Sequence, residues 1–236
     1  MINTSLLKEK VLSFGVSLDE TALERFDRYA GMLVETNKVM NLTAITEPDE
    51  IVIKHFVDSL SLLKYADIPK NASVIDVGTG AGFPGVALLI ARPDLKLTLL
   101  DSLKKRLVFL ENVLKELDLT AKTVHLRAEQ GGQDKEYREK YDFAVARAVA
   151  ALPVLSEYCL PFVKQNGEFI AMKGGLTAEE LGQSENAIKI LGGEIVSKDS
   201  FELFGRGERT IVRIKKISQT PTKYPRQTAK IVSKPL

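Results

Sequence analysis

The stretch Asp76-Val-Gly-Thr-Gly-Ala-Gly-Phe-Pro-Gly85 decides the fold, because it joins an apolar segment at residues 73–77 to a helical pattern at residues 85–91. Four glycines within ten residues allow the backbone to turn tightly and to approach a ligand closely. A strand, a glycine-rich loop and a helix in this order are typical of nucleotide-binding α/β domains. We therefore expect a nucleotide-like ligand at this loop.

The chain after this loop alternates between strand-like and helical segments. Strands are predicted at residues 95–100, 122–126, 141–146, 167–172, 194–203 and 209–217, and helices at residues 104–117, 149–163 and 178–191. Such alternation predicts an α/β fold with a doubly wound, mainly parallel seven-stranded sheet and helices on both faces. Only residues 204–208 join the last two strands, so these two strands should pair antiparallel.

The segment before the loop is predicted to be entirely helical. Helical patterns cover residues 6–14, 19–39 and about 48–65, and the second of them follows a capping box at residues 17–20. We expect three parts: an N-terminal helical extension packed on the core at residues 1–66, a ligand-binding α/β domain at residues 67–217, and a basic tail at residues 218–236.

The composition fits one α/β domain with an extension. Of 236 residues, 44% are hydrophobic and 27% are charged, which is sufficient for a sizeable core. Cys159 is the only cysteine, so neither an intramolecular disulfide nor a cysteine metal cluster can form. The chain shows no export signal and no apolar stretch of the ~18 residues that a membrane span needs. These features favour a soluble protein of the cytoplasm.

The charge is distributed unevenly along the chain. The net charge is +2, yet residues 213–236 contain seven basic residues and no acidic one, so the rest of the chain is acidic overall. A basic segment on an acidic body is suited to contact phosphates of a nucleic acid. The alternative interpretation is a frayed, solvated chain end.

Two ligand classes compete for the glycine-rich loop. Residues 80–85 formally satisfy the dinucleotide pattern, which would allow NAD and an oxidoreductase. A carboxylate at Asp76 would repel the pyrophosphate of NAD, whereas it favours the cationic groups of S-adenosylmethionine. Asp101, after the second strand, is placed to accept ribose hydroxyls, and Glu129, or the backbone around Ala128, is placed to hold the adenine edge. The alternative is that these acids are solvated loop residues.

The end of the fourth strand, residues 141–147, should carry the substrate chemistry because it adjoins the point where the strand order reverses. The sequence there is Ala146-Arg-Ala148, without the Asn/Asp-Pro-Pro-aromatic motif of enzymes that methylate exocyclic amines. Cys159 lies in an apolar segment, which argues against the cysteine nucleophile of cytosine-C5 methylation. Arg147 needs either a structural carboxylate or a substrate or cofactor group as its partner.

One face of the last N-terminal helix carries His55, Asp58 and Ser59, which follow one another at helical spacing. A lone histidine in such a position is more often structural than functional. The sequence provides no evident metal site.

Several short motifs together resemble the bacterial 16S rRNA guanine-N7 methyltransferases, once called glucose-inhibited division protein B. The motifs span nearly the whole chain: Asn41-Leu-Thr, residues 55–60, residues 76–85, Leu100-Asp-Ser102, Arg127-Ala-Glu129, Ala146-Arg-Ala148, Met172-Lys-Gly174 and Lys223-Tyr-Pro-Arg226. The combination is specific, although each motif alone is weak. After Tyr-Pro-Arg the family usually has a basic residue and then Gly-x-Pro, whereas this chain continues Gln227-Thr-Ala-Lys-Ile231.

The resemblance implies methylation of N7 of one guanosine in the decoding-region loop of 16S rRNA, with S-adenosylmethionine as the cofactor. It implies a class I methyltransferase sheet with an antiparallel seventh strand, so that residues 67–217 would form the methyltransferase domain. Arg147 is the expected catalytic residue. With the loop analysis, the expected cofactor contacts are Asp76, Gly78, Gly80, Phe83, Asp101, Ala128, Glu129 and Arg147, and the expected RNA contacts are Asn41, His55, Lys173, Lys223 and Arg226.

The expected partner is 16S rRNA or the small ribosomal subunit, and the protein is expected to act as a monomer without a metal or a membrane. Guanine N7 has a free lone pair and no proton, so methyl transfer requires alignment more than a general base. Three alternatives stay open: methylation of another RNA site, an oxidoreductase, and a nucleotide-binding module without turnover.

Overall fold

The computed structural model describes residues 1–147 and 150–236. The helices are α1 (Thr4–Leu12), α2 (Glu20–Met40), α3 (Pro48–Ile51), α4 (Asp58–Tyr65), α5 (Gly85–Ala91), α6 (Lys104–Glu116), α7 (Ala128–Gln133), α8 (Leu152–Cys159), α9 (Ala178–Ile190) and α10 (Thr228–Ser233). The strands are β1 (Ser73–Val77), β2 (Lys96–Asp101), β3 (Lys122–His125), β4 (Tyr141–Arg147), β5 (Val163–Lys173), β6 (Gly193–Glu202) and β7 (Glu208–Lys216). The end of the Ala146-Arg-Ala148 motif and the start of the helix expected at residue 149 lie outside the described residues.

The seven strands form one sheet in the order β3-β2-β1-β4-β5-β7-β6. The pairs β1·β2, β1·β4, β2·β3 and β4·β5 are parallel, whereas β7 is inserted antiparallel between β5 and β6. The predicted doubly wound sheet and its antiparallel final pair are therefore confirmed. The strand order reverses between β1 and β4, so ligands should bind at the carboxyl ends of these strands.

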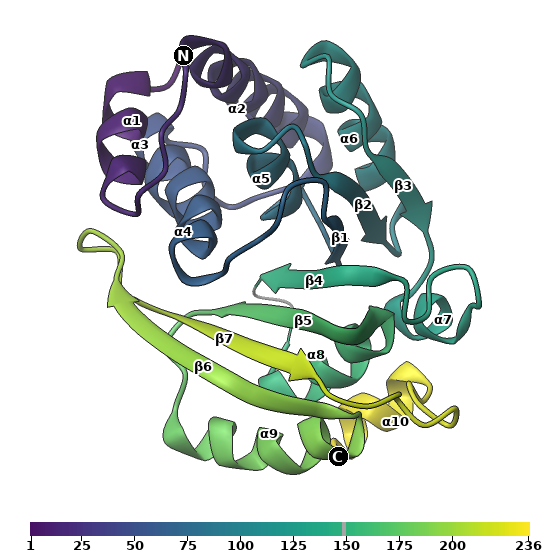
Figure 1. Cartoon of the computed structure of the whole chain (residues 1–236). Helices are drawn as coiled ribbons and strands as arrows, with labels where there is room; N and C mark the ends of the chain where they lie inside the picture. The colour runs from purple at the N-terminus through teal and green to yellow at the C-terminus, as the bar shows by residue number, and fades with distance from the viewer. Residues whose placement is uncertain (148–149) are drawn as a thin grey trace.

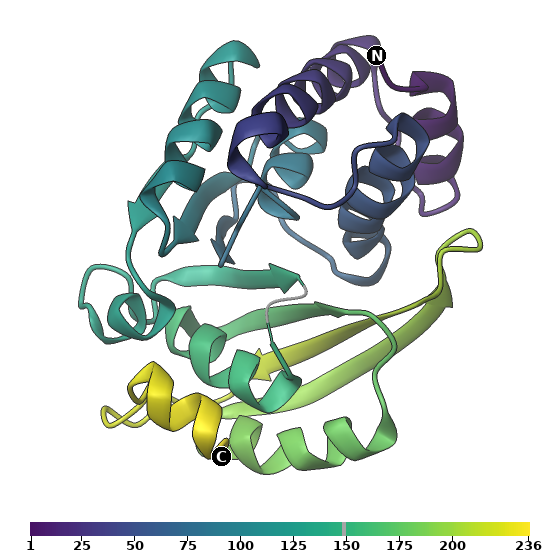
Figure 2. The same ribbon diagram turned by 180° about the vertical axis from the view of Figure 1, so that it is seen from behind.

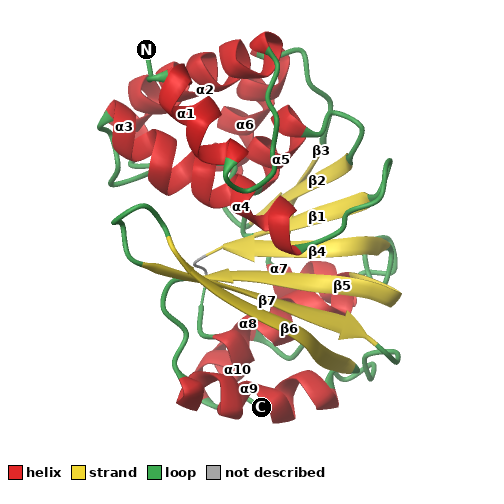
Figure 3. Ribbon diagram, turned by 60° about the vertical axis from the view of Figure 1, so that its left-hand side comes forward, coloured by secondary structure: helices red, strands yellow, loops and turns green. Residues whose placement is uncertain are grey.

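Helices cover both faces of the sheet (Figures 1 and 3). Helices α1 to α6 lie on one face, and their apolar residues form one continuous core with that face, from Leu7 of α1 through Phe26 of α2 to Val86 of α5. Helices α7 to α10 cover the other face, where Leu155 of α8 and Phe169 of β5 belong to a second core. The N-terminal helices therefore share their core with the face of the sheet on which α5 and α6 pack.

The helical segment before β1 differs from the expected regular helix. Pro48 begins it as the first residue of α3, but a π-helical turn, η1 (Val52–Val57), interrupts it before α4. A π turn widens the helix and leaves backbone carbonyls free for other partners, and such turns are frequent at functional sites. The carbonyls of Lys54 and His55, within this turn, accept hydrogen bonds from the end of β4.

Three further differences concern the second half of the chain. Residues 128–133 form the short helix α7 where a loop was expected, and β5 begins at Val163 because the preceding helix α8 ends at Cys159. The C-terminal segment, residues 218–236, is not a frayed end. Its helix α10 packs beside α8 (yellow in Figure 2), and Ile231 is buried in that contact.

Candidate functional site

The glycine-rich loop between β1 and α5 is held by the neighbouring strand end. The N–H groups of Gly78 and Thr79 donate to the carbonyl of Leu100, at 2.9 and 3.0 Å. The N–H of Gly80 donates to the carboxylate of Asp101 at 2.9 Å, and the φ of +60° at Gly80 favours glycine. The loop is therefore fixed to the end of β2, next to the residue predicted to bind a ribose.

Asp76 lies beneath this loop and is fully buried. Its Oδ2 accepts hydrogen bonds from the Thr79 hydroxyl at 2.6 Å and from the Gly85 N–H at 2.9 Å, whereas Oδ1 has no partner in the described part of the chain. Burial raises the pKa of Asp76 to about 6. The structure thus corrects the expectation of a direct cofactor contact: Asp76 supports the loop and places a carboxylate under it.

A cavity of about 400 Å³ opens in front of this loop at the carboxyl ends of the central strands. Five of the predicted cofactor residues line it: Gly78, Asp101, Ala128, Glu129 and Arg147. Cavities of this size hold small-molecule ligands, and this one lies where the strand order reverses. The other three predicted cofactor residues, Asp76, Gly80 and Phe83, do not line this cavity, and Asp76 and Phe83 are buried.

The acid at the end of β2 is oriented within the cavity. Asp101 Oδ1 accepts from the N–H of Leu103 at 2.8 Å, and Oδ2 accepts from Gly80 and pairs with Arg106 at 3.4 Å. Oδ1 keeps acceptor capacity, because an oxygen has two lone pairs and this one accepts a single hydrogen bond. The second acid, Glu129, lies in the first turn of α7, where the helix dipole favours a carboxylate.

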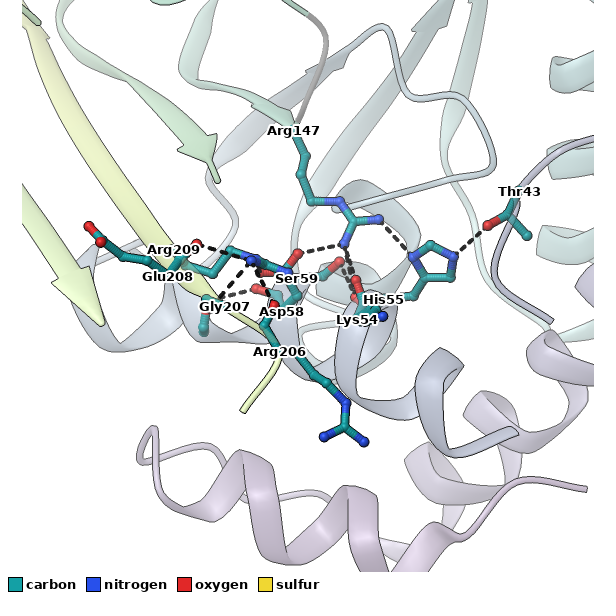
Figure 4. A network of polar contacts seen from close by, with 11 residues as sticks. Thr43, Lys54, His55, Asp58, Ser59, Arg147, Arg206, Gly207, Glu208 and Arg209 are labelled. Carbon is teal, nitrogen blue, oxygen red and sulfur yellow. Dashed lines mark hydrogen bonds and ion pairs between the residues drawn. The ribbon is translucent and has the colours of Figure 1, made fainter. Parts of the chain in front are cut away.

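Arg147, at the end of β4, is held by a network of acceptors from the N-terminal helices (Figure 4). Its Nη1 donates to the carbonyl of Lys54 at 2.8 Å and to the carboxylate of Asp58 at 3.0 Å, and its Nη2 lies 3.1 Å from His55 Nδ1. Arg209 of β7 pairs with the other carboxylate oxygen of Asp58 at 3.1 Å. Asp58 thus joins two guanidinium groups from different strands.

His55 is a neutral part of this network. Burial, with a further contribution from the charge of Arg147, lowers the pKa of His55 to about 3. Since Arg147 only donates, Nδ1 must be the accepting nitrogen of the ring, and Nε2 therefore carries the proton toward the Thr43 hydroxyl, 2.9 Å away. His55 is buried and both ring nitrogens are used inside the protein, yet the residue lines a second cavity beside Arg147, so its expected contact with RNA stays a prediction.

Phe83 is also buried, behind the network. Its ring stacks on His55 with centroids 4.4 Å apart, and the guanidinium carbon of Arg147 lies 5.0 Å from the ring centroid. Phe83 therefore orients His55 and Arg147 and does not line the cavity described above.

A second cavity, of about 360 Å³, lies on the other side of Arg147. It is bounded by Ile45 of the loop before α3, by Asp58 and Arg209, and by Lys173 at the end of β5. Among residues 1–147 and 150–236, Arg147 is the residue that lines both cavities. The end of β4 therefore separates two adjacent cavities.

The remaining predicted RNA contacts have different surroundings. Asn41 and Lys223 are exposed, as a contact with RNA requires. Lys173 lines the second cavity while it donates to the Ala150 carbonyl at 2.7 Å and pairs with Glu180 at 3.0 Å. Asn41, Lys173 and Lys223 are therefore fully or partly accessible to RNA.

Arg226 has an internal partner instead. Its side chain pairs with the buried Glu157 of α8, with an Nη2 to Oε2 distance of 2.7 Å, and its backbone N–H donates to Oε1 at 2.8 Å. This contact engages Nε and Nη2 of the guanidinium group, and the expected contact of Arg226 with RNA stays a prediction. It also explains why residues 218–236 are ordered.

Sequence reasoning missed part of the site. Asp58 lies within the motif at residues 55–60, but nothing in the sequence indicated that it pairs with Arg147 and Arg209. Arg209 itself gave no motif signal, and neither did Tyr158 and Thr228 of the first cavity. The rejected nucleophile, Cys159, is buried, and burial raises the pKa of its thiol well above the usual value. This environment agrees with its interpretation as a structural cysteine.

Across residues 1–147 and 150–236, no group of three or more His, Cys, Asp or Glu side chains is arranged to hold a metal ion. In the same part of the chain, every helix is too short or too polar to cross a membrane.

Among solved structures, the fold is similar to that of TrmN from Thermus thermophilus, with a TM-score of 0.54, 16% identity, and coverage of 68% of this chain and 48% of the other. It is also similar to the fibrillarin pre-rRNA processing protein of Methanococcus jannaschii, with a TM-score of 0.52, 14% identity, and coverage of 65% and 71%. At such identities the similarity concerns the fold alone.

The sequence itself has much closer relatives. It is 53% identical to ribosomal RNA small subunit methyltransferase G of Acetivibrio thermocellus, over 98% of this chain and 96% of the relative. It is 51% identical to the protein of the same name from Alkaliphilus oremlandii, over 98% of both chains. The family described as rRNA small subunit methyltransferase G matches residues 22–212. The chain therefore belongs to the rRNA small subunit methyltransferase G family.

Proposed function

We propose that this protein transfers a methyl group from S-adenosylmethionine to N7 of a guanosine in 16S rRNA. Membership in the family and the named relatives support rRNA of the small subunit as the substrate. The single observation that carries the assignment of the site is that Arg147 separates two cavities, one at the glycine-rich loop and one at the neighbouring strand ends. One cavity suits the cofactor and the other suits the target base.

The first cavity fits S-adenosylmethionine by its chemistry. Asp101 offers oriented carboxylate oxygens to ribose hydroxyls, and Glu129 and the backbone at Ala128 offer polar contacts to the adenine edge. Asp76, with one unpartnered buried oxygen beneath the loop, favours a cationic ligand over a pyrophosphate. These features disfavour NAD and therefore an oxidoreductase. Gly78, which lines the cavity, gives the ligand close access to the backbone.

The second cavity fits a nucleotide extruded from RNA. Lys54, Arg147, Lys173 and Arg209 contribute positive charge to its wall, and Asp58 is the acid among them. A basic wall attracts the phosphates that flank a target base. The exposed Asn41 and Lys223 extend the proposed RNA contacts onto the surface.

The residues of the site are suited to alignment and not to proton removal. S-adenosylmethionine, when bound, would supply a methyl group whose carbon a nucleophilic nitrogen can attack, with the thioether S-adenosylhomocysteine as the leaving group. Guanine N7 has a lone pair and no proton, so the chain needs no general base for this transfer. The neutral, buried His55 and the buried Cys159 are consistent with such a reaction. Arg147 holds the boundary between the two reactants, where misplacement by about 1 Å can cost on the order of a hundredfold in rate.

The test is to incubate the protein with labelled S-adenosylmethionine and with 16S rRNA, small subunits or large-subunit rRNA. Label should enter only small-subunit rRNA, and treatment with borohydride and aniline should cleave the RNA strand at the methylated guanosine. A methylated exocyclic amine, a C5-methylated pyrimidine or a 2′-O-methylribose in the digest would refute the N7 assignment. Cofactor binding without label transfer to any RNA would instead indicate a binding module.

A further inference from the structure

The wall of the first cavity includes a residue from the far end of the chain. Thr228, the first residue of α10, lines it together with Leu155 and Tyr158 of α8, opposite the loop and the end of β2. The basic composition of residues 218–236 had suggested an RNA-binding tail, so this position calls for another explanation.

The C-terminal segment is attached to α7 and α8, two of the helices that carry cavity residues. On α8, the carboxylate of Glu157 receives the side chain and the backbone N–H of Arg226, two residues from Leu155 and one from Tyr158. On α7, whose first turn contains Ala128 and Glu129, the side chain of Gln133 donates to the carbonyls of Thr222 and Pro225 at 3.1 and 3.0 Å.

A second arginine adds to this attachment. Arg138 donates to the carbonyls of Thr220 at 2.6 Å and Tyr224 at 2.8 Å, and also to the carbonyl of Gly132 in α7 at 2.7 Å. A Cβ atom on Gly132 would come within 2.9 Å of the Pro225 ring, so the two backbones meet without room for a side chain. The segment is therefore packed against α7 and α8, next to the cavity.

We propose that residues 218–236 form a wall of the S-adenosylmethionine cavity, that Thr228 contacts the bound cofactor, and that docking of this segment and binding of the cofactor stabilise each other. This inference rests on the proposed function of the first cavity. A ligand that touches α7, α8 and Thr228 at once favours the docked arrangement, and linkage requires that docking favours the ligand by the same factor.

The proposal is tested without catalysis, by calorimetry with S-adenosylhomocysteine and by hydrogen exchange of the full chain. Thr228→Phe fills the cavity and leaves the contact between Arg226 and Glu157 intact. Val232→Phe, at an exposed position of the same helix, is its matched control. We expect Thr228→Phe to weaken binding by about tenfold or more, and Val232→Phe to bind like the wild type. A chain ending at Gln227 keeps Arg226 and should also bind more weakly.

Hydrogen exchange gives an independent readout. S-adenosylhomocysteine should slow exchange of the amides in residues 219–236 of the wild type, and this protection should be lost in Thr228→Phe. If the wild type binds S-adenosylhomocysteine while Thr228→Phe binds equally well and exchange in residues 219–236 does not change, the inference fails and the proposed function stands. If the wild type does not bind S-adenosylhomocysteine at all, both fail.

Discussion

Replacement of Asp76 by asparagine should reveal how much stability the buried carboxylate costs. In the folded protein Asp76 has a pKa of about 6, compared with 3.8 in the absence of burial. A shift of about 2 units corresponds to about 3 kcal/mol, since each unit is worth about 1.4 kcal/mol. Asparagine is nearly isosteric, and its amide oxygen can accept the same hydrogen bonds from Thr79 and Gly85.

The sign of the effect follows from proton linkage. Because the pKa of Asp76 is raised on folding, its contribution to stability is fully present below about pH 4 and is lost as the pH rises through about 6. The free energy of unfolding of the wild type minus that of Asp76→Asn should therefore fall by about 3 kcal/mol between pH 4 and pH 7. Urea unfolding followed by circular dichroism at several pH values measures this difference.

Asp67→Asn is the control, because it removes the same charge from an exposed position. Its stability difference from the wild type should change little over the same pH range. Cofactor affinity gives a second measurement: binding of the cationic S-adenosylmethionine to the wild type should strengthen as the pH rises through about 6, and this dependence should be absent in Asp76→Asn. A difference curve for Asp76→Asn that is flat, or that rises with pH, would refute this account of the buried carboxylate.

Three further variants probe the site. Arg147→Lys keeps a charge beside Asp58 but loses the planar donor fork. The single-turnover rate of methylation should fall by about a hundredfold, while the cofactor affinity measured by calorimetry should stay within a few-fold of the wild-type value. Equal losses in rate and affinity would contradict the aligning role of Arg147. His55→Asn keeps an acceptor for Arg147. Because the pKa of His55 is lowered to about 3, the free energy of unfolding of the wild type minus that of this variant should grow as the pH rises from 4 to 7, as measured by urea titration. A difference that does not change with pH would contradict a neutral histidine. Arg226→Ala leaves the buried Glu157 unpaired and should lower the free energy of unfolding by about 3–5 kcal/mol, whereas Arg226→Lys should lose less; unchanged melting of Arg226→Ala would show that the pair contributes little.

The sequence predicted the sheet because its strands are buried, apolar and separated by amphipathic helices. All seven strands were found within a few residues of their actual bounds, and Asp101 and Glu129 were placed at strand ends where parallel strands bring side chains together. The sequence predicted a cofactor contact for Asp76 because this residue stands at a strand end beside the glycine-rich loop. The position of a residue in the sequence does not show on which side of a loop its side chain lies. In the structure its carboxylate points to Thr79 and Gly85.

The C-terminal segment was misjudged for a different reason. Composition records the charge of Arg226 but not the distant acid that neutralises it, and Glu157 lies 69 positions earlier in the chain. The short helices α7 and α10 contain too few residues to show a helical period. Contacts between segments that are far apart in sequence therefore account for most of what the pattern did not predict.

The orientation of Arg147 depends on the N-terminal helices as much as on the sheet. An arginine in this apolar stretch needs a partner, and the sequence left open whether that partner is a structural carboxylate or a group of the substrate or cofactor. The structure provides structural partners: the π turn frees the carbonyl of Lys54, and Asp58 and the neutral His55 complete the set. These contacts occupy Nη1 and one side of Nη2, while Nε has no partner among the described residues. Because the acceptors come from a helix packed into the shared core, a sheet domain without residues 1–66 would lose the orientation of Arg147, which lines both cavities.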